Sequence, residues 1–186
     1  MKILLTGFEP FGGNEKNISW NIVASAPQFE DCEIVKLRLP VSFKRASKFV
    51  IDAIKTEHPD VVLMFGQSKR EGINVERVAI NISDAAKPDN DGYVPVDEII
   101  EKKGASAYFS TLPIKKIVVA LQANGLDAKV SNSAGTYVCN RLSYEILHYI
   151  QQNSLPILAG FIHISKEYHE KNIIPYLCNE LKSLYL

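Results

Sequence analysis

The sequence predicts an α/β fold: a single-domain three-layer α/β/α sandwich with a mixed, mostly parallel sheet and helices on both faces. Strand-like segments alternate along the chain with segments of helical periodicity, which is the pattern of this class. The strand-like runs are continuously apolar rather than alternating, as expected of a sheet that is covered on both faces. With 186 residues and no repeat or linker composition, residues 1–186 are expected to form one domain.

The predicted strands are apolar runs that stop at glycine, proline or small polar residues. The first stops at Gly7, the second at Pro40 and the third at Gly66. In open α/β sheets the binding crevice lies at the carboxyl ends of the strands, so we expect a site in the loops that follow these ends. The runs are residues 2–6, 34–39, 61–65, 77–82, 128–131 and 157–164.

The predicted helices have apolar residues at helical spacing and recognisable ends. In 42–57 the apolar positions recur every three or four residues, and Ser42 is the expected N-cap. An interruption is expected near Pro175 in the last helix. Residues 86–92, rich in Pro, Asp, Asn and Gly, are expected to form a loop. The helices are residues 42–57, 114–123, 140–152 and 166–184.

Charge and composition argue against two classes of partner. Lys plus Arg and Asp plus Glu both number 21, so the formal net charge is zero and no basic surface for nucleic acid is expected. The longest apolar stretch, around 155–164, is about half the length that spans a bilayer. The apolar N-terminal run is too short for a signal peptide. We therefore expect a cytoplasmic protein that binds neither nucleic acid nor membrane.

The cysteines indicate neither a disulfide framework nor a metal site. Cys32, Cys139 and Cys178 are odd in number and widely separated along the chain. No Cys-x-x-Cys pair is present and no histidine spacing matches a zinc site, so no metal is expected. The lack of a disulfide framework fits a reducing compartment. Two of the three cysteines are expected to be small core residues.

Cys139 differs from the other cysteines in its local context. A strand predicted at 128–131 runs into a small, turn-forming stretch, and a helix follows at once. This order places Cys139 in or near the first turn of that helix, where unpaired N–H groups and the helix dipole favour a thiolate. The same N–H groups could form an oxyanion hole. The alternative is a buried helix cysteine without a chemical role, and the local pattern favours the two about equally.

A thiol nucleophile needs a general base, and the chain has four histidines. His58 precedes a proline at a helix end, His148 lies more than two turns into the helix after Cys139, and His169 lies in a charged helix. His163 differs because it lies between two isoleucines at the end of an apolar strand. Imidazole titrates near neutral pH, so this position suits a general base. A lone histidine there is, however, more often a satisfied core residue.

Glu76 and an aromatic loop are the remaining candidates. Glu76 begins a strand-like run and could orient an imidazole, although a surface ion pair with Arg77 is the commoner arrangement. Residues 6–13 place Phe8 and Phe11 among glycines but lack the patterns that cradle phosphate, which disfavours nucleotide binding. The two rings suit the wall of an apolar pocket, or else they fill core beneath a tight turn.

Taken together, these segments resemble the pyroglutamyl peptidase I (pyrrolidone carboxyl peptidase) family. The resemblance runs from Met1 to about Ser165, and its parts occur in the same order throughout. Several of them are long and unusual. They are TGFEPFGG at 6–13, NISW at 17–20, ERVAIN at 76–81, KPDNDGY at 87–93, AYFSTLPIK at 107–115, SNSAGTYVCN at 131–140 and GFIHI at 160–164.

The resemblance implies a cysteine omega-peptidase that removes an N-terminal pyroglutamyl residue from peptides through a thioacyl-enzyme. Cys139 matches the nucleophile of the family, His163 its general base and Glu76 the acid that orients the histidine. The resemblance also implies a cytosolic α/β/α protein that assembles as a homotetramer and needs no metal or organic cofactor. The matching pocket residues are Phe8 and Phe11, which enclose the pyroglutamyl ring, and Asn17 and Gln67, which lie in segments near it.

The chain departs from the family pattern in three places. The family usually has Arg two residues before the Pro of its Pro-Asp-Asn turn, where this chain has Ala86. The loop 66–75 is one residue shorter and more charged than usual, and Arg70 in it is a candidate replacement for the missing positive charge. After His163 the chain also lacks the Pro-rich segment of the family.

These departures keep other readings open. One is a diverged homologue with weak or no peptidase activity, which binds pyroglutamyl-like ligands or cleaves another small acyl group. The other is a structural or interaction domain, which is less favoured because all three triad candidates are present.

Overall fold

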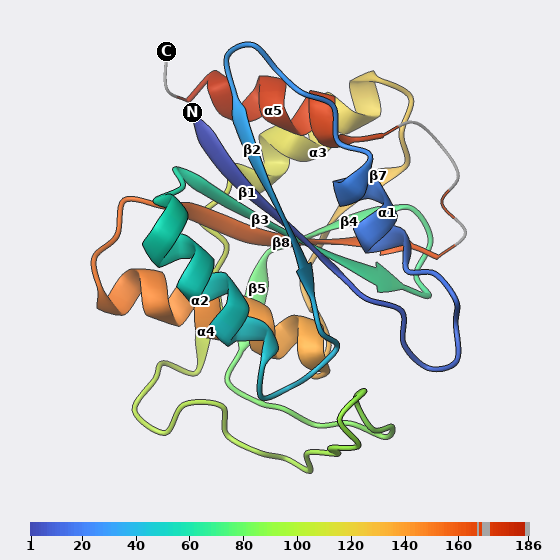
Figure 1. Ribbon diagram of the computed structural model, residues 1–186, viewed down its shortest axis with the longest axis vertical. Coiled ribbons are helices and arrows are strands. Elements are labelled where there is room, and N and C mark those ends of the chain that lie inside the picture. Colours follow the sequence, from blue (N-terminus) through green and yellow to red (C-terminus); the bar gives the residue numbers. More distant parts are fainter. Residues whose placement is uncertain (167, 169–171, 185–186) are drawn as a thin grey trace.

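The computed structural model describes residues 1–166, 168 and 172–184. Six strands form one sheet in the order β2-β1-β3-β8-β4-β7 (Figure 1). β2, β1, β3 and β8 are mutually parallel, whereas β4 and β7 are parallel to each other and β4 is antiparallel to β8. β8 therefore joins the two halves of the sheet. The strands are β1 (Lys2–Phe8), β2 (Glu33–Leu39), β3 (Val61–Ser68), β4 (Ile73–Glu76), β7 (Ala128–Ser131) and β8 (Leu158–Ser165).

Helices cover both faces of this sheet (Figure 1). One face carries α1 (Ile18–Ala24), α3 (Ile114–Ala123) and α5 (Ile174–Lys182). The other face carries α2 (Ala46–Glu57) and α4 (Val138–Gln152). A separate antiparallel pair, β5 (Val78–Ile80) and β6 (Ala107–Phe109), lies beside α4.

β3 shows why continuously apolar strands give two cores. Val61, Leu63 and Phe65 point into the core under α1, α3 and α5. Val62 and Met64 point into the core under α2 and α4. All five side chains are fully buried, and each face of the strand buries its own row because side chains alternate along a strand. The predicted α/β/α sandwich with a mixed, mostly parallel sheet is therefore confirmed.

Several predicted boundaries differ in the structure, two of them near the site. The helix expected at 42–57 begins at Ala46, because the chain first makes a turn in which the Ser42 hydroxyl accepts a hydrogen bond from the Arg45 N–H at 3.2 Å. The strand expected at 77–82 is only β5 and belongs to the two-stranded sheet. Glu76, expected to begin that strand, instead ends β4.

Three short elements were not predicted, and the last helix is shorter than expected. α1, β4 and β6 are three to seven residues long, too short for a clear periodicity. α5 begins at Ile174, with Pro175 in its first turn, where proline is well tolerated. Residues 167 and 169–171 of the predicted helix, His169 among them, lie outside the described residues.

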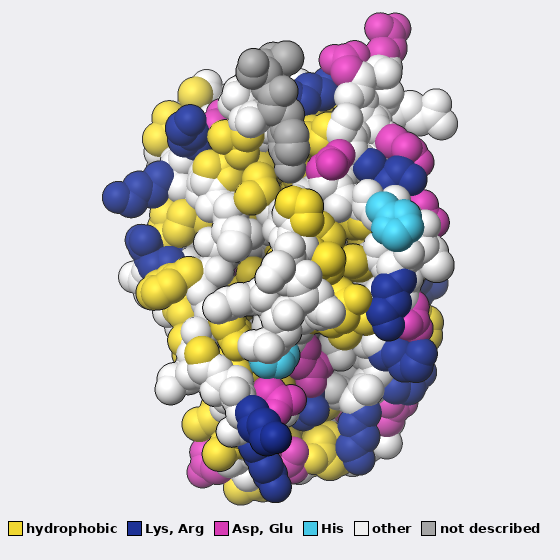
Figure 2. Space-filling view, turned by 90° about the vertical axis from the view of Figure 1, so that its left-hand side faces the viewer, with side chains coloured by type: hydrophobic (Ala, Val, Ile, Leu, Met, Phe, Trp, Pro, Cys, Tyr) yellow, Lys and Arg dark blue, Asp and Glu magenta, His cyan; other side chains and the backbone are white. Residues whose placement is uncertain are grey.

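Figure 2 views the molecule from the left-hand side of Figure 1, where β3 and β8 begin. Apolar side chains are interspersed there with charged side chains of both signs, in keeping with the balanced composition. Within the described part of the chain, every helix falls short of the length and apolarity that a membrane span requires.

Candidate active site

Cys139 lies in the first turn of α4, with Tyr137 as the N-cap residue. The helix begins two residues earlier than predicted, which confirms the expected position of the cysteine at its N-terminus. Among the described residues, no backbone group accepts a hydrogen bond from the N–H of Val138 or Cys139, and the Cys139 N–H faces the sulfur of its own side chain. These donors are the orphan N–H groups of a helix start, and they are available to an oxyanion.

The thiol of Cys139 is the resting form at neutral pH. Burial, and after it the nearby negative charge of Glu76, raise its pKa to about 12. The Arg70 guanidinium and the cysteine's own backbone N–H act in the opposite direction but do not outweigh burial. The helix N-terminus, which the sequence suggested would favour a thiolate, is therefore not sufficient to ionise Cys139 at neutral pH. The cysteine needs a base that takes its proton.

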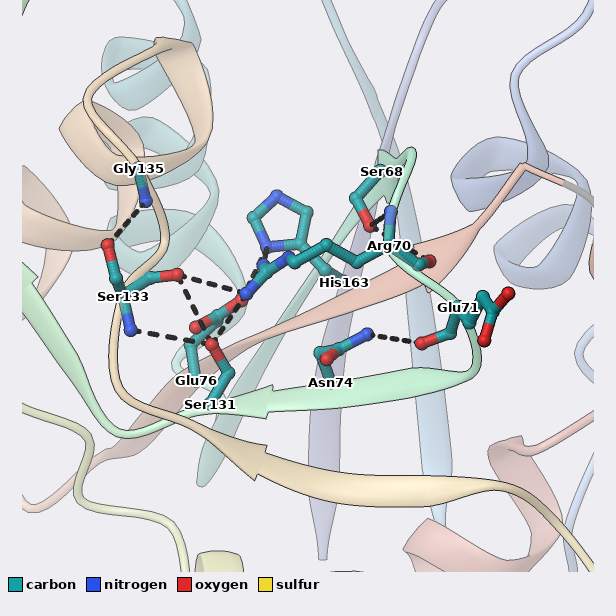
Figure 3. Close-up of polar contacts among 9 residues, drawn as sticks. All are labelled: Ser68, Arg70, Glu71, Asn74, Glu76, Ser131, Ser133, Gly135 and His163. Carbon is teal, nitrogen blue, oxygen red and sulfur yellow. Dashed lines mark hydrogen bonds and ion pairs between the residues drawn. The ribbon is translucent and has the colours of Figure 1, made fainter.

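His163 and Glu76 form a buried hydrogen-bonded pair. Glu76 ends β4 and His163 lies near the end of β8, and the antiparallel register puts both side chains on the face that α4 covers. His163 Nδ1 lies 2.7 Å from Glu76 Oε1, as Figure 3 shows. Because an ionised carboxylate only accepts hydrogen bonds, this contact assigns the proton to Nδ1 and leaves Nε2 as the basic atom.

Gly66 brings the cysteine and the histidine to the same place. In the parallel register of β3 and β8, Gly66 lies opposite His163. A β carbon on Gly66 would lie 2.9 Å from Cys139 Sγ, so the sulfur occupies the space that a side chain would otherwise take. Cys139 and His163 are not hydrogen-bonded to each other in this structure, and such contacts often tighten only when substrate binds.

A narrow, mainly apolar pocket opens beside Cys139. The pocket contains all four residues that the resemblance assigned to it, together with residues that were not predicted. Tyr137 is the most informative addition, because its ring lies 6.4 Å from that of Phe11 and packs edge-on against Phe43. The sequence could have indicated Tyr137 as a pocket residue, because it lies two residues before Cys139 in the SNSAGTYVCN segment. The lining residues are Phe8, Phe11, Asn17, Val41, Gln67, Tyr137, Val138 and Cys139.

The two polar residues of the pocket have different duties. The Asn17 side chain is buried and fully engaged: its amide donates to the Glu9 carbonyl at 2.9 Å, and its oxygen accepts from the N–H and hydroxyl of Ser19. It therefore holds the loop that carries Phe8 and Phe11. The Gln67 oxygen accepts from the Ile18 N–H at 3.1 Å, which leaves its NH₂ group as a donor for a ligand.

The 87–93 segment supports this loop from outside. Asn90 donates its side-chain amide to Glu9 Oε1 at 2.9 Å and to the Pro10 carbonyl at 3.0 Å. The Asp89 carboxylate accepts from the Phe43 N–H at 2.8 Å, and the Tyr137 hydroxyl donates to the Pro88 carbonyl. The Pro-Asp-Asn turn thus stabilises the loop and the side chains that form the pocket.

Asn140, which sequence reasoning missed, anchors the start of α4. It is fully buried, and its oxygen accepts from the Ile80 N–H at 2.9 Å. Its amide donates to the carbonyl oxygens of Ile80 and Ile82, both at 2.9 Å. The residue after the cysteine therefore ties the helix N-terminus to β5.

The other two histidines that the structure describes, His148 and His58, lie away from this site. His148 contacts the Tyr108 hydroxyl at 2.8 Å, and His58 is the C-cap of α2 in a left-handed conformation. Cys32 and Cys178 are buried in the core on the opposite face of the sheet, as expected of small core residues.

A model of the pyroglutamyl peptidase family matches residues 1–179. The chain belongs to the pyroglutamyl peptidase family. Members of this family are cysteine hydrolases. The resemblance of the sequence motifs is thereby confirmed.

Named relatives and solved structures agree with this membership. The chain is 50% identical over 182 residues to pyrrolidone-carboxylate peptidase 1 of Caldanaerobacter subterraneus subsp. tengcongensis, which covers 95% of this chain and 90% of that protein. A pyrrolidone carboxyl peptidase mutant of Pyrococcus furiosus superposes with a TM-score of 0.92 at 33% identity over the whole of both chains. Pyroglutamyl peptidase I of Bacillus amyloliquefaciens gives a TM-score of 0.86 at 38% identity, covering 97% of this chain and 91% of that one.

Ala86, where the family pattern has arginine, lines a second, wider groove that continues from the pocket. The groove shares Phe11, Gln67 and Tyr137 with the pocket and has a volume of about 560 Å³. Arg70 does not line it. The idea that Arg70 replaces the missing arginine in the substrate groove is therefore not supported, since Arg70 reaches the Glu76–His163 pair instead.

Proposed function

We propose that this chain is a cysteine omega-peptidase that hydrolyses the peptide bond after an N-terminal pyroglutamyl residue. The observation that carries the proposal is the Glu76–His163 pair beside a helix-start cysteine, at the mouth of an apolar pocket. A diverged, inactive homologue is less favoured, because each triad member is in place and relatives at 45–50% identity are named as peptidases.

The first chemical step is acyl transfer to sulfur. As the Cys139 sulfur attacks the carbonyl carbon after the ring, its proton passes to Nε2 of His163. Glu76 holds the imidazole by Nδ1 and stabilises the positive charge that forms on it. The N–H groups of Val138 and Cys139 donate to the oxyanion of the tetrahedral intermediate.

The second step frees the enzyme. The His163 imidazolium gives its proton to the leaving amine, and the peptide without its pyroglutamyl residue departs. A water molecule, deprotonated by the same imidazole, then attacks the thioester and releases pyroglutamate. The neutral thiol is restored, and no metal or cofactor enters either step.

Recognition of the ring follows from its chemistry. A pyroglutamyl ring is a flat, neutral lactam, so it offers apolar faces and one amide edge instead of a charge. Phe8 and Phe11 provide the apolar walls, and the Gln67 amide is placed to donate to the lactam carbonyl. The wider groove past Ala86 takes the residues that follow the ring.

The assembly and location implied by the resemblance are also proposals. We propose a homotetramer in the cytoplasm. Multi-angle light scattering after size exclusion measures the mass directly, and a mass near that of one or two chains of 20.8 kDa at micromolar concentration would contradict the tetramer.

Hydrolysis of a fluorogenic pyroglutamyl amide tests the activity. Wild type is expected to release the fluorophore, and Cys139→Ser to lose nearly all of that release. The matched control is Cys32→Ala, which removes a cysteine far from the pocket and should retain activity in the folded protein. Hydrolysis that survives Cys139→Ser would reject this nucleophile. Folded wild type that binds a pyroglutamyl aldehyde without cleaving the amide would favour the inactive homologue.

A further inference from the structure

Arg70, in the loop between β3 and β4, reaches over the Glu76–His163 pair. Its Nη2 donates to Glu76 Oε1 and lies 3.0 Å from His163 Nδ1. Its Nη1 donates to the Ser131 hydroxyl at 2.7 Å and to the Ser133 carbonyl at 3.1 Å. Figure 3 shows the guanidinium between the β4 carboxylate, the histidine ring and the loop after β7.

One carboxylate oxygen of Glu76 accepts hydrogen bonds from two donors. Nδ1 of His163 and Nη2 of Arg70 both point at Oε1, while Oε2 is buried and has no hydrogen-bond partner among the described residues. A carboxylate that is 2% exposed needs such partners to compensate for its lost contact with water. Arg70 supplies a permanent charge, since guanidinium does not lose its proton in proteins.

The same guanidinium also acts on the other two members of the triad. Beside His163 it places a permanent positive charge 3.0 Å from Nδ1, on the edge of the ring that faces Glu76. Towards Cys139 it opposes the effect of Glu76, because the guanidinium lowers the pKa of the thiol whereas the carboxylate raises it. Glu76 without Arg70 would hold the histidine but would also hinder ionisation of the thiol.

We propose that Arg70 is a positioning residue of the triad: it holds the Glu76 carboxylate in place at His163 Nδ1, and its charge offsets the carboxylate so that Cys139 can transfer its proton. The proposal rests on the peptidase function proposed above. Arg70 then acts together with the three triad residues. Of these four side chains Arg70 is the most exposed, with 41% of its side chain accessible to solvent.

Arg70→Met tests this role, because methionine keeps much of the length and apolar stem but removes the charge and the donors. On the pyroglutamyl amide, kcat should fall roughly tenfold or more, since each pKa unit of mismatch between donor and acceptor costs a factor of ten. KM should change by less than about threefold, because Arg70 does not line the pocket or the groove. The acidic limb of the kcat/KM profile should move to higher pH, because Arg70 lowers the pKa of the Cys139 thiol and the variant loses this effect.

Arg77→Met is the matched control. Arg77 follows Glu76 and bonds the same loop, through Asn132 Oδ1 at 2.7 Å, but it does not contact the triad. It should change neither kcat nor the pH profile by more than about twofold. Arg70→Lys keeps the positive charge but loses the planar set of donors of the guanidinium. It should restore the acidic limb of the profile while recovering kcat only in part.

Alkylation of Cys139 by iodoacetamide, followed by mass spectrometry of its peptide, gives a readout that needs no substrate. Arg70→Met should alkylate more slowly than wild type at each pH between 6 and 9, because Arg70 lowers the pKa of the Cys139 thiol and its loss leaves a smaller fraction of thiolate. Unchanged kcat, pH profile and alkylation would overturn the proposal. So would a loss of activity that merely follows a loss of folded protein, with the pH profile intact. If wild type cleaves no pyroglutamyl amide, the proposed function fails, and the alkylation comparison still decides on Arg70.

Discussion

A β carbon on Gly66 would lie 2.9 Å from the Cys139 sulfur and 2.7 Å from the Phe161 ring. Real β carbons essentially never approach other atoms this closely. The absence of a side chain at position 66 is therefore what lets a cysteine from a helix lie over the sheet, directly beside the strand that carries His163.

Gly66→Ala is expected to displace Cys139 from His163. A shift near 1 Å in a reacting group lowers the rate on the order of 100-fold, so we expect a loss of that size in kcat/KM on the pyroglutamyl amide. The control is Gly160→Ala in β8. Its new β carbon would lie 2.3 Å from Ser110 Oγ and would also meet Leu112, on the face of the sheet opposite Cys139. That variant should lose stability but keep the kcat of its folded fraction. Full activity in Gly66→Ala would contradict the geometry.

Asn140→Ala is expected to destabilise the fold. The substitution leaves the Ile80 N–H and two carbonyl groups without partners in a buried place, which costs about 2–4 kcal/mol of the free energy of unfolding. Urea denaturation followed by circular dichroism measures this cost. Asn153→Ala, at the exposed C-cap of the same helix, removes one hydrogen bond to Tyr149 and should cost less than about 0.5 kcal/mol. Equal effects of the two variants would rule out a special role for Asn140.

Asp91→Asn is expected to change how stability depends on pH. The Arg45 guanidinium, helped by the Ser42 hydroxyl, lowers the pKa of Asp91 from 3.8 to about 2. A carboxyl group whose pKa is lower in the folded state stabilises that state above its unfolded pKa, and this contribution is lost as the pH falls through the folded pKa. Wild type should therefore be more stable than Asp91→Asn above about pH 4, and the difference should vanish near pH 2.

Denaturant titrations at a series of pH values measure that difference. High salt should reduce it, because the Arg45–Asp91 ion pair is partly exposed. A difference between the two proteins that stays constant from pH 7 to pH 2 would show that the ion pair is not its source.

Ala86→Arg is expected to raise kcat/KM on pyroglutamyl amides. The position lines the groove next to Phe11 and Gln67, so an arginine there can donate to the substrate carbonyl, and one charge-assisted donor in a catalytic site is worth about 2–4 kcal/mol. Ala86→Met, of similar length but uncharged, is the control and should give no gain. If both variants behave like wild type, the groove does not need a cation here and Ala86 is not a defect.

Much of the fold could be predicted because the buried strands are long and apolar. β1, β3 and β8 were located by composition alone, since every residue from Val61 to Phe65 is buried on one face or the other. β4 was missed for a functional reason. Its sequence Ile-Asn-Val-Glu places Asn74 and Glu76 where an ordinary strand would bury apolar side chains, so the strand that carries a catalytic candidate is the one that breaks the pattern.

The site could be predicted only in part. The position of Cys139 at a helix start followed from the strand, turn and helix order, but its partners followed from the family motifs. Glu76 and His163 are 87 residues apart, and nothing local indicates that β4 runs antiparallel beside β8. The role suggested for Arg70 was wrong for the same reason. An arginine in a loop can reach many partners, and only the packing of the sheet determines that it contacts Glu76 and His163.

The central place of β8 has a consequence for how the chain becomes active. Before β8 pairs, β2-β1-β3 and β4-β7 are two unconnected ribbons, and Gly66 and Glu76 lie on different ones. β8 comes from residues 158–165, so a chain growing on the ribosome holds Cys139 and Glu76 long before it holds the strand that unites them. Contacts between residues so distant in sequence form slowly. We therefore expect peptidase activity to appear at the last step of refolding, after the helical signal has recovered, so that turnover reports the closing of the sheet.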